Sequence, residues 1–331
     1  MKVCLVQRLE GVGGPAAFQR RLLSGLTHRK IDFTFDLDDT PFDAALVINA
    51  SRSMGKLRRR KREGVRIVQR LGGLNWQHKF LRMSLTMRLQ ASIRNMMMRV
   101  TRSLLADQII YQSKFVKTWW ETAHGPTQVP NSVIHNGVDL TEMAFCGKQA
   151  KGASGESILS VEGTQGIDPF RIAERTTEGL AERGRQVHLT MFGQQIASVG
   201  SPPRNSNLVT YGGQVPQNVL PDYYRRAQVF ISTDVIAACP NSVIESLACG
   251  TPVVGYDAGA LPELVGSEGG ICIEPKANPL KGHDPGNSIA LVDAAEAVIE
   301  GGEKFRKEAR ERAESQFDVD MMVDRYLAAL G

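Results

Sequence analysis

The chain has 331 residues, 42% of them hydrophobic and 23% charged, with 5 cysteines and a formal net charge of +5. This composition is typical of a globular protein and argues against a disordered chain. The length is sufficient for two domains of ordinary size. The cysteines are odd in number and form no C-x-x-C pair, so we expect buried free thiols, a reducing compartment and no metal site. The sequence has no run of 18 apolar residues, which argues against a membrane-spanning helix.

The charge is distributed unevenly along the chain. Residues 1–130 hold 23 Lys and Arg against 9 Asp and Glu, a net charge of +14, whereas residues 131–331 hold 17 against 26, a net charge of −9. A basic first part and an acidic second part indicate two domains with different partners.

Short apolar runs rich in β-branched residues alternate with helix-like runs along the chain. Such runs predict strands buried on both faces, and the alternation predicts parallel, doubly wound α/β sheets. The chain opens on a strand that is too short, and too soon followed by charges, for a signal peptide. In chain order, the predicted strands are 2–6, 44–50, 66–71, 108–113, 157–162, 187–193, 207–213, 229–233, 251–256 and 270–273.

Ten strands are more than one sheet of this type holds comfortably, so we predict two sheets in two domains. The break falls near residues 140–156, which are rich in Gly, Ser and Lys and lack apolar periodicity. The predicted domains are 1–140 and 141–316. Residues 317–331 form a final helix that either packs on the nearest domain or crosses back to the first.

The segment from Pro240 to Val254, PNSVIESLACGTPVV, combines a helix signal with a buried strand. Ser242 and Glu245 predict a capping box, so we expect the helix to begin there and to end at Gly250. Backbone N–H groups at a helix N-terminus suit a diphosphate. Glu245 in the first turn either accepts hydrogen bonds from a ribose diol or only caps the helix.

This segment resembles the signature of the family 4 retaining glycosyltransferases. The resemblance implies the GT-B fold, in which two Rossmann-like domains face a central cleft and the helix 317–331 joins the first domain. It extends over nearly the whole chain, since further family-like pieces occur in the expected order at 9–26, 106–117, 133–140, 211–233 and 317–330.

The resemblance also implies a donor site. Glycines of the N-terminal loop would let the backbone approach the donor, although such a loop is otherwise simply a tight turn. The matching positions are Gly13 and Gly14 for that loop, Gly163 and Thr164 after the first strand of the second domain, Gln214 and Val215 near the base, Asn241, Ser242 and Val243 around the diphosphate, and Glu245 at the ribose.

Several positions depart from the family pattern. The first of two signature glutamates falls at Ala237, and the His or Asp that often follows the 66–71 strand falls at Gly72. The Arg and Lys that usually face the diphosphate fall at Gly163 and Gln165, so two cations that would stabilise the leaving group are missing. Other residues could contact the phosphate or the acceptor in place of the missing cations. The candidates are Arg70, His78, Arg171 and Arg175, and the alternative for each is that it is only a charged surface residue.

Two basic segments remain. Residues 56–62, KLRRRKR, contain six cations, and residues 79–102 predict a long basic amphipathic helix with Leu85, Leu89 and Ile93 on its apolar side. Such a helix can lie on an anionic membrane surface. We favour the alternative that the stripe packs into the first domain. No aromatic platform accompanies the charge, so a nucleic-acid partner is not expected.

Together these patterns predict a metal-independent glycosyltransferase of the hexosyltransferase type that needs no cofactor. It would move a sugar from a nucleotide-diphosphate donor to a hydroxyl of a glycan or lipid-linked acceptor, with retention. We expect it in the cytoplasm, or peripheral at the inner membrane face. Two alternatives stay open: a non-catalytic GT-B partner subunit that binds sugar nucleotide or glycan, and a GT-B epimerase, whose acidic residues the sequence does not locate.

Overall fold

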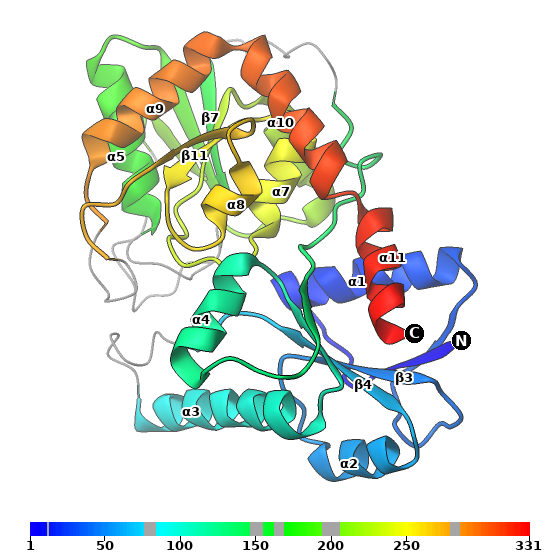
Figure 1. Cartoon of the computed structure of the whole chain (residues 1–331). Helices are drawn as coiled ribbons and strands as arrows, with labels where there is room; N and C mark the ends of the chain where they lie inside the picture. Colours follow the sequence, from blue (N-terminus) through cyan, green and yellow to red (C-terminus); the bar gives the residue numbers. More distant parts are fainter. Residues whose placement is uncertain (12, 76–83, 146–154, 162–168, 194–205, 279–284) are drawn as a thin grey trace. The chain divides into compact units, whose positions relative to one another are not determined.

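The computed structural model describes residues 1–331 except 12, 76–83, 146–154, 162–168, 194–205 and 279–284. The chain divides into two compact units, and each contains a six-stranded sheet (Figure 1). Unit 1 comprises Met1–Gly137 and Val319–Gly331, and unit 2 comprises Val138–Asp318. These boundaries lie close to the predicted ones at 140 and 316. All paired strands are parallel, so the predicted pair of doubly wound sheets is confirmed.

Unit 1 has the strand order β2-β1-β3-β4-β5-β6. Its strands are β1 (Lys2–Leu5), β2 (Asp32–Thr34), β3 (Ala44–Ile48), β4 (Arg66–Leu71), β5 (Gln108–Tyr111) and β6 (Asn131–Val133). Its helices are α1 (Gly14–His28), α2 (Met54–Arg62), α3 (Leu85–Val100), its continuation η2 (Thr101–Leu105), α4 (Lys114–His124) and α11 (Val319–Leu330).

Unit 2 has the order β12-β11-β10-β7-β8-β9. Helices α5 and α9 pack against each other, and α7 packs against both α6 and α8. These two groups of helices cover the two faces of the sheet. The strands are β7 (Glu156–Val161), β8 (Val187–Phe192), β9 (Val209–Tyr211), β10 (Val229–Ile231), β11 (Val253–Tyr256) and β12 (Gly270–Ile273). The helices are α5 (Pro169–Glu182), η3 (Gln217–Val219), α6 (Leu220–Arg226), α7 (Asn241–Ala248), α8 (Leu261–Val265), α9 (Ser288–Gly301) and α10 (Glu303–Gln316).

The core of unit 1 lies on both faces of its sheet. Alternate residues of β1 contribute to opposite sides: Val3 and Leu5 join a cluster with α1 and α11, whereas Cys4 joins one with Leu57 of α2. On the first side the chain's last helix packs directly on α1 (Figure 1). The rings of Phe18 and Tyr326 lie 4.9 Å apart, centroid to centroid.

Helix α3 contradicts the favoured expectation for residues 79–102. Leu85, Leu89 and Ile93 are exposed, so the predicted apolar stripe does not pack into unit 1. The helix contacts the unit through its opposite side, where Met98 is buried and the Asn95 side chain accepts a hydrogen bond from the Asn75 N–H at 3.0 Å. In the part of the chain that the structure describes, no helix is long and apolar enough to cross a bilayer.

Of the four cysteines that the structure describes, none is in a disulfide, and Cys4, Cys239 and Cys249 are buried. Burial is the main cause that raises the pKa of the Cys4, Cys249 and Cys272 thiols to about 12. These thiols are therefore protonated near neutral pH and are poor nucleophiles. Cys146 lies outside the described residues.

The contact between α1 and α11 gives a prediction about Gly25. A Cβ at this position would lie 2.4 Å from Cγ2 of Val323. Replacing Gly25 by Ala should therefore lower the melting temperature through overpacking, which costs about 1–3 kcal/mol. In a Val323→Ala background the clash is gone and Ala keeps its helix propensity, about 1 kcal/mol better than Gly. We expect Gly25→Ala to be stabilising there, as a thermal double-mutant cycle would measure; equal effects in both backgrounds would contradict this packing.

Candidate functional site

The sheet of unit 2 has a topological switch point between β7 and β10. From β7 the chain proceeds to β8 and β9 on one side, and from β10 it proceeds to β11 and β12 on the other. In parallel sheets of this kind, ligands bind outside the carboxyl ends of the strands at this point. Helix α7 follows β10, so its N-terminus lies at this edge. The segment after β7, which includes Gly163, Thr164 and Gln165, lies outside the described residues.

Helix α7 begins at Asn241, and its N-cap is Pro240, which makes no side-chain cap hydrogen bond. The predicted capping box of Ser242 and Glu245 is therefore wrong. Ser242 lies within the first turn and Glu245 lies beyond it, because the N-cap is two residues earlier than the pattern indicated. The N–H groups of Asn241, Ser242 and Val243 occupy the first turn, where a helix has no carbonyl partners of its own.

Glu245 is 6% exposed and lies on α7 in contact with α6. Tyr224 donates its Oη–H to Glu245 Oε2 at 3.4 Å. Glu245 is the fifth residue of α7, so it does not occupy the third helical position that the predicted capping box required.

The carboxyl end of α7 is fixed by a side chain of α10 and by one of its own side chains. Arg310 of α10 donates Nη1–H bonds to the Ala248 carbonyl at 2.5 Å and to the Met143 carbonyl at 2.8 Å. Ser246 donates its hydroxyl to the Thr251 carbonyl at 2.9 Å. A cation at the carboxyl end of a helix complements its dipole. Arg310 thus satisfies carbonyls at the carboxyl end of the helix, whereas the N-cap residue at the other end is a proline, which makes no side-chain cap hydrogen bond.

Gln214 and Val215 follow a two-glycine turn at the end of β9. Gly213 has φ +65°, and a Cβ on Gly212 would lie 2.5 Å from the Phe192 ring. The Gly193 N–H donates to the Gly213 carbonyl at 2.9 Å, which ties this turn to the end of β8. Gln214 is exposed and Val215 half-buried at the same sheet edge as the start of α7.

The loop between β10 and α7 contains the position of the missing glutamate. Ala237 is buried, and its carbonyl accepts a hydrogen bond from the Ala260 N–H at 2.9 Å. Three residues earlier stands Asp234, whose Oδ1 accepts from the Ile236 N–H at 3.1 Å. Burial raises the pKa of the Asp234 carboxyl from 3.8 to about 7. Sequence reasoning missed Asp234; its place just beyond a buried strand was the available signal.

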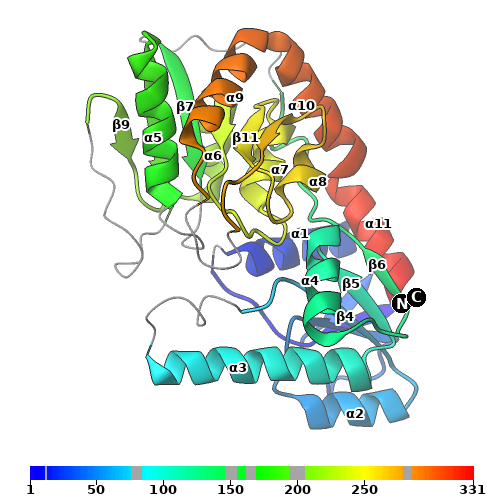
Figure 2. The same cartoon turned by 60° about the vertical axis from the view of Figure 1, so that its left-hand side comes forward.

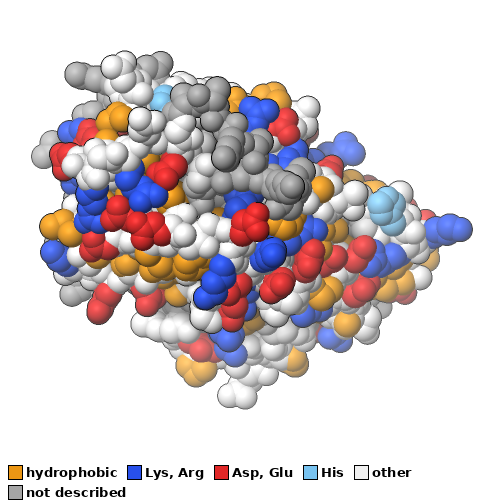
Figure 3. Space-filling model, turned by 90° about the horizontal axis from the view of Figure 1, so that it is seen from above, with side chains coloured by type: hydrophobic (Ala, Val, Ile, Leu, Met, Phe, Trp, Pro, Cys, Tyr) orange, Lys and Arg blue, Asp and Glu red, His pale blue; other side chains and the backbone are white. Residues whose placement is uncertain are grey.

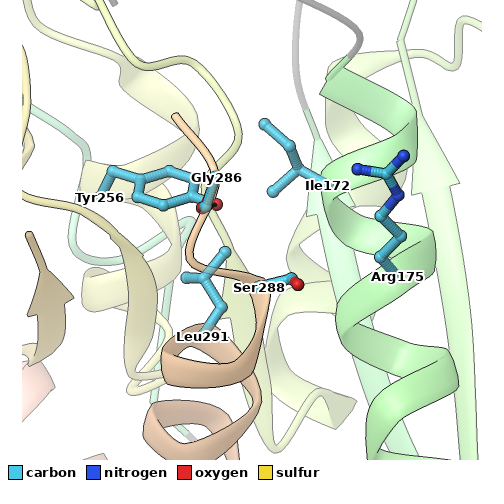
Figure 4. A pocket seen from close by; sticks show the side chains of 6 residues that line it. All are labelled: Ile172, Arg175, Tyr256, Gly286, Ser288 and Leu291. Carbon is cyan, nitrogen blue, oxygen red and sulfur yellow. Dashed lines mark hydrogen bonds between the residues drawn. The ribbon is translucent and has the colours of Figure 1, made fainter. Parts of the chain in front are cut away.

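The two arginines of α5 are exposed. Arg171 lies 3.9 Å from Glu174, a long ion pair. Arg175 and Ile172 line a small pocket of about 40 Å³, and they face Tyr256 and the segment 286–291 across it (Figure 4). This volume holds only a few water molecules. The role of Arg171 as a phosphate contact stays a prediction.

The N-terminal loop of unit 1 lies at the carboxyl edge of its own sheet, beside the switch point between β1 and β3. Gln7 fixes the loop by donating its Nε2–H bonds to the carbonyls of Ile48 and Ala50 at 2.7 and 2.8 Å. Gly13 is the N-cap of α1, with an ordinary φ of −68°, and Gly14 is its first residue. A Cβ on either glycine would meet no atom within 4 Å, so packing within unit 1 does not require glycine there.

Gly72 occupies the position at which the family resemblance implied a His or Asp, and it makes its hydrogen bonds through its backbone. Its N–H donates to Asn49 Oδ1 at 2.8 Å, and its carbonyl accepts from Trp120 Nε1 at 2.9 Å. A Cβ would lie 2.6 Å from Gln112 Nε2, so a larger side chain would have to displace Gln112. His78, which was expected to compensate, lies outside the described residues.

Arg70 is completely buried at the end of β4. Its Nη2 donates to Asn136 Oδ1 at 2.7 Å, and its guanidinium carbon lies 3.8 Å from the centroid of the Phe18 ring. Its Nε and Nη1 are buried without a hydrogen-bond partner in the structure. In this conformation Arg70 stabilises the contact between α1 and the sheet rather than presenting its charge at the surface. The described residues also contain no group of three His, Cys, Asp or Glu side chains that could hold a metal ion.

Comparison with known proteins agrees with this architecture. Residues 171–300 match a family model described as glycosyl transferases group 1. Over 104 residues the chain is 30% identical to TuaC of Bacillus subtilis, a proposed teichuronic acid biosynthesis glycosyltransferase. The match covers 30% of this chain and 27% of that relative, so it spans about a quarter of TuaC.

Solved structures resemble the whole chain. The crystal structure of Anabaena HepE in complex with UDP has a TM-score of 0.70 at 15% identity, covering 100% of this chain and 99% of HepE. Sucrose-phosphate synthase from Thermosynechococcus elongatus has a TM-score of 0.63 at 15% identity, covering 98% and 80%. Such low identities carry the fold alone. The chain therefore has the GT-B fold, and its second unit contains a segment that matches the group 1 glycosyl transferases.

The raised pKa of the half-buried Asp234 gives a prediction of pH dependence. Its pKa is raised in the folded protein, so its stabilising contribution is complete below the unfolded value of 3.8 and is lost as the pH rises towards about 7. Asp234→Asn keeps the Oδ1 acceptor for Ile236 and removes the ionisation. Relative to this variant, the wild type should lose stability between pH 4 and 7, with a slope of at most about 1.4 kcal/mol per pH unit. Denaturant unfolding at several pH values measures this; parallel profiles would contradict it.

Proposed function

We propose that the protein is a glycosyltransferase that transfers a hexosyl group from a nucleotide-diphosphate donor to a hydroxyl of a glycan or lipid-linked acceptor, with retention. The observation that carries the proposal is the N-terminus of α7 at the switch point of unit 2, with Glu245 one turn further along. The fold and the match over residues 171–300 support it. HepE, of the same fold, has been crystallised with UDP and with UDP-glucose.

The diphosphate binds at the start of α7. The first-turn N–H groups and the helix dipole together favour an anion there. The N-cap residue Pro240 makes no side-chain hydrogen bond to these N–H groups, and Arg310 satisfies carbonyls at the other end of the helix. Stabilising the leaving diphosphate by oriented N–H groups lowers the barrier to transfer without a resident metal ion.

The rest of the donor lies along the same sheet edge. Glu245 accepts hydrogen bonds from the ribose hydroxyls, with Tyr224 fixing the carboxylate. The base lies near Gln214 and Val215, beyond the turn that Gly212 and Gly213 make possible. At Gly13 and Gly14 the open space around each missing side chain leaves room for a ligand to approach the backbone of unit 1.

A non-catalytic GT-B protein that binds sugar nucleotide is the second candidate. It is favoured by Ala237, which is buried and offers no carboxylate to the sugar, and by Arg171, which is exposed and held only by a long ion pair. The two candidates differ in turnover. An enzyme of this class releases UDP or another nucleoside diphosphate from a nucleotide sugar, whereas a binding protein retains the donor intact.

We expect Glu245→Gln to weaken nucleoside-diphosphate binding by about tenfold or more, because a charged acceptor is lost at the ribose. Isothermal titration with UDP and GDP measures this, and thermal melting checks that the fold is intact. Glu311→Gln, an exposed residue of α10, is the matched control and should bind as the wild type does. If the wild type binds neither nucleotide at millimolar concentration, the donor site is not where we propose it.

Retention is tested on the product. The anomeric configuration of the new glycosidic bond, followed by NMR from a panel of nucleotide sugars, should equal that of the donor. An inverted product would overturn the retaining assignment while leaving the transferase intact. Donor that is bound but not consumed, in the presence of candidate glycan and lipid acceptors, would favour the non-catalytic candidate.

A further inference from the structure

Helix α3 presents an apolar stripe to solvent. Leu85, Leu89, Ile93 and Met96 are between 50% and 81% exposed. At 100° per residue these four positions lie within an arc of about 80° of the helix. Most of the stability of a helix in a protein comes from packing its apolar face, so a stripe left in water marks a surface that something else covers.

The charges around this stripe all have one sign. Arg88 and Arg99 follow one edge of it, Arg94 lies on the other side of the helix, and all three are exposed. Within the described residues none of the three takes part in an ion pair. The sequence contains no Asp or Glu from residue 64 to residue 106. The helix therefore combines exposed aliphatic side chains with uncompensated positive charge.

The basic run on α2 has a different character, although it contains more cations. Asp38 forms ion pairs with Lys56, Arg59 and Arg60, and Lys61 lies 2.6 Å from Asp107. Those contacts lower the pKa of the Asp38 carboxyl, with the hydrogen bond from Lys56 as the largest cause. The run is thus partly neutralised by its own unit.

Mixed charge is also what other surfaces of the chain show. Lys and Arg side chains stand beside Asp and Glu across the face seen in Figure 3. Directly after α5, for example, Arg183 pairs with both Asp293 and Glu296. The uncompensated charge of α3 is therefore a local feature of that helix.

We propose that α3 docks on an anionic lipid bilayer. The four apolar side chains would enter the boundary between headgroups and acyl chains, with the helix lying in the plane of the interface. Arg88 and Arg99 would bind headgroup phosphates beside the stripe, and the stems of these side chains would lie along the apolar region. Figure 2 shows α3 as a long helix beside the sheet of unit 1, with α2 next to it. This inference goes beyond the proposed function and does not depend on it.

A second copy of the chain fits this face less well. In a symmetric contact, both copies would bring Arg88 and Arg99 to the same interface. No acidic residue of the segment 64–106 is available to pair with them, and like charges brought together oppose association. A bilayer containing anionic lipid supplies both the apolar phase and the negative charge.

The test is co-sedimentation of the full chain with vesicles of phosphatidylcholine, with and without phosphatidylglycerol. The wild type should bind the anionic vesicles, bind the neutral ones far less, and dissociate progressively as salt is raised. The triple variant Leu89→Gln, Ile93→Gln, Met96→Gln should bind at least tenfold more weakly. Met87→Gln alters an exposed apolar residue of the same helix outside the stripe and should bind like the wild type. Thermal melting shows whether each variant folds.

A second pair of variants separates α3 from α2. Arg88→Gln with Arg99→Gln should weaken binding to anionic vesicles, whereas Arg58→Gln with Arg62→Gln, on exposed positions of α2, should have a smaller effect. The reverse order would overturn the proposal, as would absence of salt-sensitive binding by the wild type. Dimers seen by sedimentation velocity without lipid, and abolished by the triple variant, would instead identify a second copy as the occupant.

Discussion

The parallel pairing of every strand is the constraint on which the rest of the structure depends. Because the strands are parallel, their carboxyl ends gather at one edge of each sheet, and the chain returns to the start of the next strand through a crossover. In unit 1 this brings the loops after β1, β3 and β4 together, and in unit 2 those after β8, β9 and β10. Gly212 and Asn241 therefore lie at the same edge of the sheet because each follows a strand of that sheet, and no direct contact between them is needed.

Two arginines of α10, the buried Arg306 and the half-buried Arg310, hold α6 and α7 at their carboxyl ends. Arg306 donates to the carbonyls of Ala227 and Arg225 beside the end of α6, and Arg310 does so at the end of α7. These bonds satisfy carbonyls that a helix cannot satisfy alone. The bond from Arg310 holds α7 at its carboxyl end, which helps to orient the helix and so to place its N-terminus.

The sequence predicted the central strands well because they are buried on both faces and therefore apolar throughout. It missed β2 and β6, which are three residues long, lie at the sheet edges and carry residues such as Asp32 and Asn131. It misplaced the start of α7, because the Ser-x-x-Glu spacing that is typical of a capping box occurs here at the second and fifth residues of a helix that begins directly after Pro240.

Two further features depend on three-dimensional surroundings. An amphipathic pattern shows that α3 has an apolar side, but it does not show what covers that side. Asp234 belongs to no motif, and its raised pKa follows only from burial at the end of β10. Of the candidate donor and contact residues, Gly163, Thr164 and His78 lie outside the described ranges, so their roles rest on the sequence alone.

The loops at the carboxyl edge of unit 1 are joined by neutral amides. Gln7 and Gln69 donate to backbone carbonyls, Asn49 accepts from the Gly72 N–H, and Asn136 accepts from Arg70. Carboxamides do not ionise. The hydrogen bonds that Gln7, Gln69 and Asn49 make to the backbone therefore stay the same in acidic and alkaline surroundings.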